Sequence, residues 1–203
     1  FLQFVFSAAD TAMKAGAGFY IWHGESEGLN FRRACEATGW NIKQCLIWVK
    51  NHATLGRQDY QWKHEPCLYG WKDGAAHYFI KQRKQKTVID YEEDFDLMTA
   101  DELRTFIKEY LEPSTIIRAD KPQKNGDHPT IKPIPLIEKQ IKNSTKTGEI
   151  VLDIFGGSGT TLIACEQLKR KCYTCELDPK YCDVIIKRWE NLTGQKAERI
   201  ESA

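Results

Sequence analysis

The segment from Glu149 to Leu162 constrains the fold of this chain more than any other. It opens with a run of β-branched and aliphatic residues, Ile150 to Ile154, which is typical of a strand buried on both faces of a sheet. Glycines follow, and they allow a sharp turn and a close approach to a ligand, because a Cβ there would clash. Hydroxyl residues then suit the capping of a helix start, and a helix N-terminus attracts carboxylate or phosphate. The glycines are Gly156, Gly157 and Gly159, and the hydroxyl residues are Ser158, Thr160 and Thr161.

A second predicted strand, Cys172 to Glu176, ends in an acid about twenty residues after the glycine turn. In dinucleotide-binding folds this layout places the acid against the ribose hydroxyls of the ligand. Leu162 stands where the third glycine of the dinucleotide fingerprint would be, so the ligand need not carry a pyrophosphate. A nucleoside with a short charged tail fits the pattern equally well, and S-adenosylmethionine is such a molecule.

The bulk composition indicates a class of protein and a compartment. A chain of 203 residues suits one α/β domain, and it has no apolar run long enough to span a bilayer, so we expect no membrane partner. The formal net charge is +1, so partners have to be inferred from local patches. Seven scattered cysteines indicate reduced thiols and a cytoplasmic location. Cys172 and Cys175 form an isolated C-x-x-C pair without further ligands at metal-binding spacing, and we expect no metal site.

Helices and strands alternate along residues 1–72. Residues 1–14 predict a helix with an apolar 3.6-residue period, and residues 29–38 predict a second helix closed by Gly39. This order of elements is typical of an α/β fold with a Rossmann-like, doubly wound, mostly parallel sheet. The strands of this part are predicted at 19–23, 40–50 and 64–71.

Residues 73–127 fit the alternating pattern poorly, and we interpret them as an insertion. A capping box that starts at Thr99 predicts a helix over 99–111 within it. The insertion also contains a basic run, which either contacts a phosphate backbone or forms an ordinary solvated face. Residues 128–203 hold the glycine turn, with further helices predicted at 133–143 and 178–192. The basic run includes Lys81, Arg83 and Lys84.

Several ordered blocks of the chain resemble the amino-directed DNA methyltransferases of the β arrangement, which methylate adenine N6 or cytosine N4. Asp153–Thr161 resembles the cofactor loop of that family, and Glu176 resembles its ribose acid. His128–Pro133 resembles the block that closes over the methionine end of the cofactor. The resemblance covers residues 1–72 and 128–197, and the order of the blocks is itself specific. The target-side blocks of the family resemble Gly18–Trp22, Leu46–Lys50 and His64–Pro66.

The resemblance implies S-adenosylmethionine as the cofactor and a role for each matching residue. Asp153 would meet the cofactor amine, Glu176 would bind both ribose hydroxyls, and Leu177 would pack on the adenine. The methionine and sugar would be bordered by Phe155, Gly156, Gly157, Ser158 and Gly159, with Thr160 next to them in the same block. The carboxylate end would be held by His128, Thr130 and Lys132.

The resemblance also implies double-stranded DNA as the substrate, with adenine N6 favoured over cytosine N4, in a bacterial or phage-encoded restriction–modification setting. Residues 73–127 would then hold much of the target-recognition surface. Dimers occur in the family, so a homodimer is a further expectation. Candidate DNA contacts are Lys50, Arg57 and Lys63, together with the basic run of the insertion.

One departure from the family pattern leaves alternatives open. The acidic-Pro-Pro-aromatic tetrapeptide that activates the target amine in this family does not occur in the 203 residues. We therefore expect the catalytic residues upstream of Phe1 and none in this chain. The alternative is a non-catalytic DNA- or partner-binding relative that kept the fold. A nicotinamide-dependent oxidoreductase shares the strand–glycine–acid layout, but Leu162 and the order of the blocks argue against it.

Overall fold

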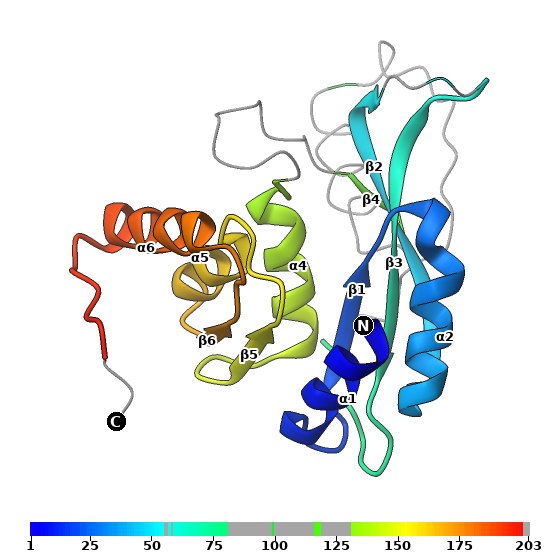
Figure 1. Ribbon diagram of the computed structural model, residues 1–203, viewed down its shortest axis with the longest axis horizontal. Coiled ribbons are helices and arrows are strands. Elements are labelled where there is room, and N and C mark those ends of the chain that lie inside the picture. The colour runs from blue at the N-terminus through cyan, green and yellow to red at the C-terminus, as the bar shows by residue number, and fades with distance from the viewer. Residues whose placement is uncertain (55–56, 58, 81–98, 100–115, 119–130, 201–203) are drawn as a thin grey trace.

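A computed structural model shows the chain as two sheets with helices packed around them (Figure 1). The structure describes residues 1–54, 57, 59–80, 99, 116–118 and 131–200. A four-stranded sheet has the order β1-β3-β2-β4, and a two-stranded sheet pairs β5 with β6. The strands are β1 (Gly18–Trp22), β2 (Ile42–Thr54), β3 (Trp62–Trp71), β4 (Ile116–Arg118), β5 (Ile150–Asp153) and β6 (Lys171–Thr174). The helices are α1 (Leu2–Ala12), α2 (Gly28–Thr38), α4 (Ile134–Ser144), α5 (Thr160–Gln167) and α6 (Pro179–Thr193), with a 3-10 turn at Glu25–Glu27.

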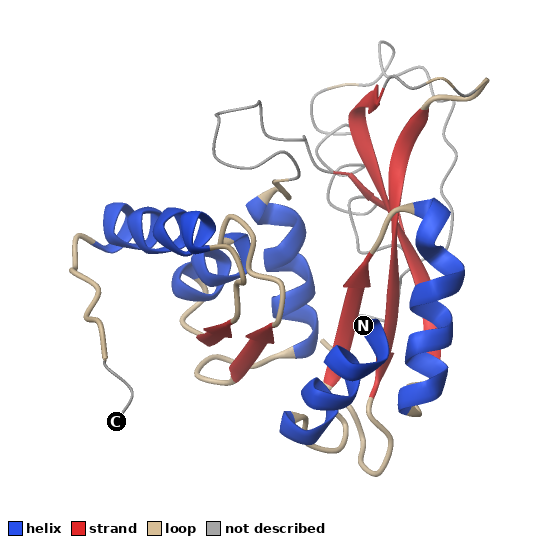
Figure 2. Ribbon diagram, in the orientation of Figure 1, coloured by secondary structure: helices blue, strands red, loops and turns tan. Residues whose placement is uncertain are grey.

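Helices cover both faces of the four-stranded sheet, because its side chains alternate between two apolar layers (Figure 2). Phe19 and Leu68 point to the layer of α1 and α2, where Phe19 stacks on Trp40 at 4.9 Å between ring centroids. Tyr20 and Trp22 point to α4 on the other face, and the Tyr20 hydroxyl lies 2.8 Å from the Ser144 hydroxyl. This three-layer arrangement confirms the predicted α/β class.

Strand β3 runs antiparallel between β1 and β2, whereas β4 pairs parallel with β2. The segment β1–α2–β2 is a crossover that leaves one position free between its two strands, and the β2–β3 hairpin returns β3 into that position. The periodicity of the sequence predicted these strands but not the direction of β3. It also missed β4, which is only three residues long and lies inside the predicted insertion.

The two-stranded sheet is a parallel β–α–β unit, in which α5 connects β5 to β6. Its covered face packs Val151 and Cys172 against α4 and α5. The prediction that the strand is buried on both faces is wrong for the described residues. Ile150 is 61% exposed and Leu152 40% exposed, because α4 and α5 cover one face and no described element covers the other.

Helix α4 packs against both sheets and connects them. Its Gln140 accepts a hydrogen bond from the Trp22 indole of β1 at 3.2 Å. Its Ile137 and Ile141 pack with α5 in the core of the two-stranded sheet. Since Ser144 lies beside Tyr20 and Gln140 beside Trp22, α4 runs antiparallel to β1, and its N-terminus reaches the edge where β1 ends.

Most predicted element boundaries hold to within a few residues, including the ends of two helices at Gly39 and Gly194. Asp178 caps α6 by accepting a hydrogen bond from the Lys180 amide at 2.9 Å. Strand β2 extends to Thr54, four residues past the predicted end at Lys50. The helix predicted over 99–111 lies outside the described residues apart from Thr99. Among the described helices, none has the length and apolar character needed to cross a membrane.

Candidate cofactor and DNA site

The glycine turn between β5 and α5 is pinned to the end of β6 by backbone hydrogen bonds. The Gly156 amide donates to the Cys175 carbonyl at 2.8 Å, and the Cys175 amide donates to the Asp153 carbonyl at 2.9 Å. A Cβ on Gly156 would lie 2.5 Å from the Thr174 hydroxyl oxygen, so only glycine fits this approach. Gly159 has a φ of +79°, a left-handed conformation that glycine adopts without a steric cost. The predicted close-approach turn is therefore present.

The hydroxyl residues of this turn do not cap α5, which corrects the sequence prediction. The N-cap position is Gly159, which has no side chain that could accept from the free amides of the helix start. Ser158 and Thr160 are both buried, and their hydroxyl oxygens lie 3.4 Å apart. The Thr160 hydroxyl instead donates to the Lys132 carbonyl at 3.3 Å. Its hydrogen bond thus links the turn to the segment that leads into α4.

Asp153 ends β5 at the opening of the turn. Its Oδ1 accepts a hydrogen bond from the Phe155 amide at 3.0 Å. Within the part of the chain that the structure describes, Oδ2 has no hydrogen-bond partner. An ionised carboxylate can accept several hydrogen bonds, so one oxygen orders the turn while the other remains able to bind a cationic amine.

Glu176 closes the turn from the opposite strand. Its Oε2 accepts from the Gly157 amide at 2.7 Å, and its Oε1 accepts from the amides of Leu177 and Asp178 at 2.8 and 3.0 Å. The carboxylate therefore ties the glycine turn to the loop that precedes α6. This contact was not predicted, although the pairing of a glycine turn with an acid about twenty residues later was.

Apolar side chains at the rim of the turn are open to solvent. Leu177 is 96% exposed and Phe155 is 51% exposed, so each offers an apolar surface to a planar ligand. The ring of Phe1 lies beside Phe155, with 6.4 Å between centroids. The first residue of the chain is thus next to the glycine turn.

The structure places Lys132 between the two sheets. Its carbonyl accepts the Thr160 hydroxyl, and its ammonium forms an ion pair with Glu65 of β3 at 3.1 Å. The ammonium also lies 5.8 Å from the ring centroid of Trp22. The other two residues predicted to hold the cofactor carboxylate, His128 and Thr130, lie outside the described residues.

Lys50, predicted as a DNA contact, forms an ion pair with the same acid. Its Nζ lies 2.8 Å from Glu65 Oε1, and its side chain is only 8% exposed. We call Lys50, Glu65 and Lys132 the lysine–glutamate cluster. Burial raises the pKa of Glu65, but the two ammoniums outweigh that effect and hold the pKa below its ordinary value. The two ammoniums therefore keep the Glu65 carboxylate ionised at neutral pH.

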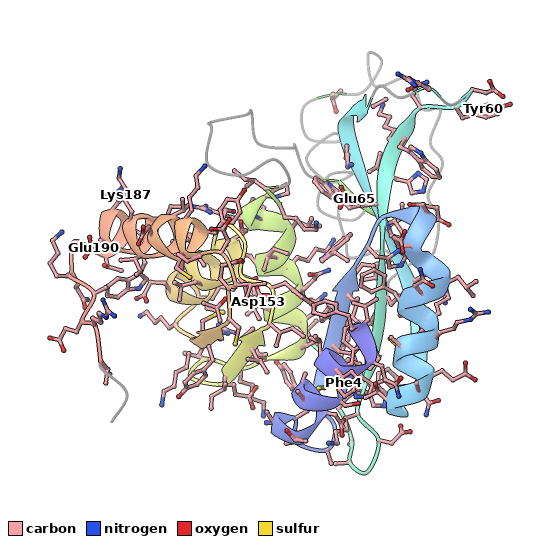
Figure 3. All side chains as sticks on the ribbon, viewed as in Figure 1. Phe4, Tyr60, Glu65, Asp153, Lys187 and Glu190 are labelled. Atoms are coloured by element: carbon pink, nitrogen blue, oxygen red, sulfur yellow. The ribbon has the colours of Figure 1, made fainter. Side chains whose placement is uncertain are left out.

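The cluster lies at the edge of the four-stranded sheet where β1 ends, next to the part of β2 and β3 that continues past β1. Strand alternation places Trp48 and Lys50 on the α4 face, and the register sets Trp48 opposite Glu65. In Figure 3, Glu65 and Asp153 are carried by different sheets. The hydrogen bond from the Thr160 hydroxyl to the Lys132 carbonyl joins the cluster to the glycine turn.

A β-hairpin formed by the ends of β2 and β3 extends beyond that edge and carries Tyr60 at its far end (Figure 3). Tyr60 is 91% exposed, and Trp62 is 38% exposed and packs edge-on against His64. Arg57 and Lys63, both predicted DNA contacts, are exposed on this hairpin. The remaining predicted contacts, Lys81, Arg83 and Lys84, lie outside the described residues.

Glu65 is the residue of this site that sequence reasoning missed. It lies in the block His64–Pro66, but no local pattern marked it as a charged centre. Its partners Lys50 and Lys132 are 15 and 67 positions away in the sequence. Lys50 was predicted as a DNA contact and Lys132 as a holder of the cofactor carboxylate, and only the strand register and the position of the segment before α4 bring them to the same acid.

Comparison with known proteins relates the chain to DNA methylases. A family model described as DNA methylase matches residues 1–188. The type II methyltransferase M.BglI of Bacillus subtilis is 29% identical over 158 residues, which are 78% of this chain and 41% of that protein. The type II methyltransferase M2.DpnII of Streptococcus pneumoniae is 42% identical over 65 residues, or 32% of this chain and 24% of that protein. The chain thus spans less than half the length of these curated relatives.

Solved structures show the same fold. The structure of an M1.HpyAVI–SAM complex superposes with a TM-score of 0.69 at 24% identity, covering 92% of this chain and 81% of that one. PvuII DNA methyltransferase, described as cytosine-N4-specific, superposes with a TM-score of 0.66 at 17% identity, covering 93% of this chain and 70% of that one. At these identities the likeness establishes the fold alone.

Proposed function

The chain belongs to the DNA methylase family, and on that premise we propose that it transfers a methyl group from S-adenosylmethionine to the N6 amino group of adenine in double-stranded DNA. The observation that carries the proposal is the geometry around Glu176. Its carboxylate accepts a hydrogen bond from the Gly157 amide of the glycine turn at 2.7 Å. The exposed side chains of Leu177 and Phe155 flank the same turn. A nucleoside needs this combination of a carboxylate for its sugar, a backbone without side chains and an apolar face for its base.

The residues of the turn fit S-adenosylmethionine in three respects. The absence of a Cβ at Gly156 lets the backbone of the turn lie directly against the end of β6. The carboxylate of Glu176 lies beside the Gly157 amide of the turn, at 2.7 Å, and a carboxylate is the group that accepts ribose hydroxyls in nucleoside sites of this layout. Asp153 Oδ2 is available to the α-ammonium, since only Oδ1 bonds the Phe155 amide. When bound, the cofactor supplies a methyl made electrophilic by its sulfonium.

The target amine needs activation that these 203 residues do not provide. An exocyclic amine on a base ring is a poor nucleophile because its lone pair is delocalised into the ring. Acceptors for its N–H bonds localise that lone pair, and the acidic-Pro-Pro-aromatic segment of the family supplies them. Phe1 lies beside Phe155, so residues joined to the N-terminal side of Phe1 would enter at the glycine turn. We propose that the activating segment precedes Phe1.

On the DNA side, the β2–β3 hairpin supports contact with the phosphate backbone. Arg57 and Lys63 carry its exposed positive charges, and Tyr60 and Trp62 provide aromatic faces for unstacked bases. The target base has to leave the duplex, at a cost of a few kcal/mol, before its amine can reach the cofactor. Phosphate contacts on the hairpin would hold the duplex during that step without reading its sequence. The proposed reading surface is residues 73–127.

Nucleoside analysis tests the proposal. DNA incubated with the full-length protein and S-adenosylmethionine is digested to nucleosides, and mass spectrometry identifies the methylated species. We expect N6-methyladenine, whereas N4-methylcytosine would retain the methyltransferase assignment but overturn the choice of adenine.

A second candidate is a binding-only relative, which the absence of the activating tetrapeptide from these residues favours. The same assay separates the two candidates. Saturable binding of S-adenosylmethionine without any methylated nucleoside, in a preparation that binds duplex DNA, would replace the enzyme with the binding-only protein.

A further inference from the structure

We infer that Glu65 is a positioning residue for the cofactor turn, acting through Lys132 from the opposite sheet; this inference rests on the proposed binding of S-adenosylmethionine. Glu65 lies in β3, whereas the glycine turn follows β5 of the other sheet, and the ion pairs of Glu65 are with Lys50 and Lys132. Its ion pair with Lys132, at 3.1 Å, fixes the side chain of a residue whose carbonyl accepts the Thr160 hydroxyl. The chain of contacts thus runs from Glu65 through Lys132 to the first residue of α5.

The surroundings hold this chain of contacts in one arrangement. Lys50, almost fully buried, occupies the other oxygen of Glu65 at 2.8 Å, so the carboxylate cannot turn away without leaving a buried cation unpaired. Each ammonium also lies near an indole, with Lys50 5.7 Å from the ring centroid of Trp48 and Lys132 5.8 Å from that of Trp22. The two rings pack edge-to-face at 6.3 Å.

Charge makes Glu65 the central member of the cluster. With the acid ionised, two cations share one anion, and each ammonium retains hydrogen-bond donors for other partners. Without the negative charge, the two ammoniums would repel each other across a partly buried space. Lys50 is held within β2, whereas Lys132 lies in the short segment before α4 and is 23% exposed. We therefore expect Lys132 to be the member that moves.

Movement of Lys132 would affect the glycine turn through the hydrogen bond between the Lys132 carbonyl and the Thr160 hydroxyl. Its carbonyl would leave the buried Thr160 hydroxyl, which directly follows the left-handed Gly159 at the start of α5. The amides of that helix start and of the glycine turn form the wall of the proposed cofactor site. If these amides become more mobile, a larger free energy is needed to order them when the cofactor binds, and the affinity falls.

A double-mutant cycle tests this route in the full-length protein, with calorimetric titration of S-adenosylmethionine as the readout. Glu65→Gln removes the charge and keeps the shape, and Thr160→Val removes only the hydroxyl that reaches Lys132. We expect each variant to weaken binding by roughly three- to tenfold, the range of one hydrogen bond. The double variant should be no weaker than the worse single one, because both changes break the same route.

A matched control separates positioning from general stability. Asp10 accepts the Trp40 indole and the Lys72 ammonium, both at 2.9 Å, near the opposite face of the same sheet. Asp10→Asn should lower the melting temperature while leaving cofactor affinity unchanged. Thr160→Ser, which keeps the hydroxyl, should recover most of the affinity that Thr160→Val loses.

The outcomes distinguish this inference from the proposed function. If the wild-type protein does not bind S-adenosylmethionine, the proposed function fails. If wild type binds and Glu65→Gln binds equally well, Glu65 does not position the turn. If the two single effects multiply in the double variant, the route through Lys132 and Thr160 is overturned.

Discussion

The two sheets of this molecule contribute different kinds of chemical group to the candidate site. In the two-stranded sheet the site consists mostly of backbone amides and the carboxylates of Asp153 and Glu176, arranged around a tight glycine turn. In the four-stranded sheet it consists of side chains from separate segments, brought together by strand register. The difference shows that one fold can combine a site formed by a short sequence motif with a site whose residues come together only in the tertiary structure.

The sheets also differ in how they are buried. Trp48 and Leu68 of the four-stranded sheet are 1% and 0% exposed, whereas Tyr173 of the two-stranded sheet is 61% exposed. The smaller sheet therefore buries less apolar surface and depends more on its backbone hydrogen bonds. A ligand that binds only the native state would add stability that grows with the logarithm of one plus the ratio of ligand concentration to Kd. Substitutions in the two sheets should separate these two sources of stability.

The largest effect is expected from Gly156→Ala in the glycine turn. The new methyl group would lie 2.5 Å from the Thr174 hydroxyl and 3.1 Å from Ile185 Cδ1, and both neighbours are packed. We expect a loss of about 1–3 kcal/mol in the free energy of unfolding, as for other overpacked sites, together with loss of cofactor binding. Denaturant unfolding and calorimetric titration measure the two quantities.

Gly24→Ala is the matched control for that substitution. A Cβ on Gly24 meets nothing nearer than the Ser26 hydroxyl at 4.0 Å, and its φ is −70°. Its effect on stability should stay within about 0.5 kcal/mol. Wild-type cofactor affinity in Gly156→Ala would show that the turn does not form the binding wall.

The next largest effect is expected from Glu176→Ala. Hydrogen bonds to a charged group contribute about 1.5–3 kcal/mol each, so the affinity for S-adenosylmethionine should fall by at least about tenfold. Glu176→Gln, which keeps one acceptor for the Gly157 amide, should fall between wild type and the alanine variant. Glu138→Ala, which removes an exposed pair with Lys142 on α4, serves as the control. Unchanged affinity in Glu176→Ala would remove the ribose assignment.

The part of the site on the two-stranded sheet could be predicted from the sequence better than the part on the four-stranded sheet. Gly156, Gly159 and Glu176 were found because each is tied to a local backbone demand that a short pattern reveals. Glu65 was not found, and Lys50 was interpreted as a surface DNA contact, because their ion pair exists only through the register of β2 with β3. The antiparallel direction of β3 was missed for a similar reason, since hydrophobic alternation does not encode strand direction.

A smaller effect is expected from the β2–β3 hairpin on DNA affinity. Arg57→Ala together with Lys63→Ala should weaken duplex binding equally for all sequences and lower the slope of log affinity against log salt by about 0.9 per lost phosphate contact. Fluorescence anisotropy at several salt concentrations measures that slope. Lys187→Ala removes an exposed charge from α6, far from the hairpin in Figure 3, and should leave the slope unchanged. Equal slopes for wild type and the double variant would exclude the hairpin from the DNA interface.

The smallest effect is expected from pH, and it should arise at Asp10 of α1, which packs on the four-stranded sheet. The Trp40 indole and the Lys72 ammonium hold the pKa of Asp10 below its ordinary value. A carboxyl with a lowered pKa stabilises the fold above its unfolded pKa, and this stabilisation is lost as the pH falls through the folded pKa. Asp10→Asn should therefore melt below wild type at pH 7 and approach the wild-type melting temperature as the pH falls below about 4. Melting curves across this range measure the gap, and a gap that stays constant with pH would show that Asp10 acts through packing and neutral hydrogen bonds instead of charge.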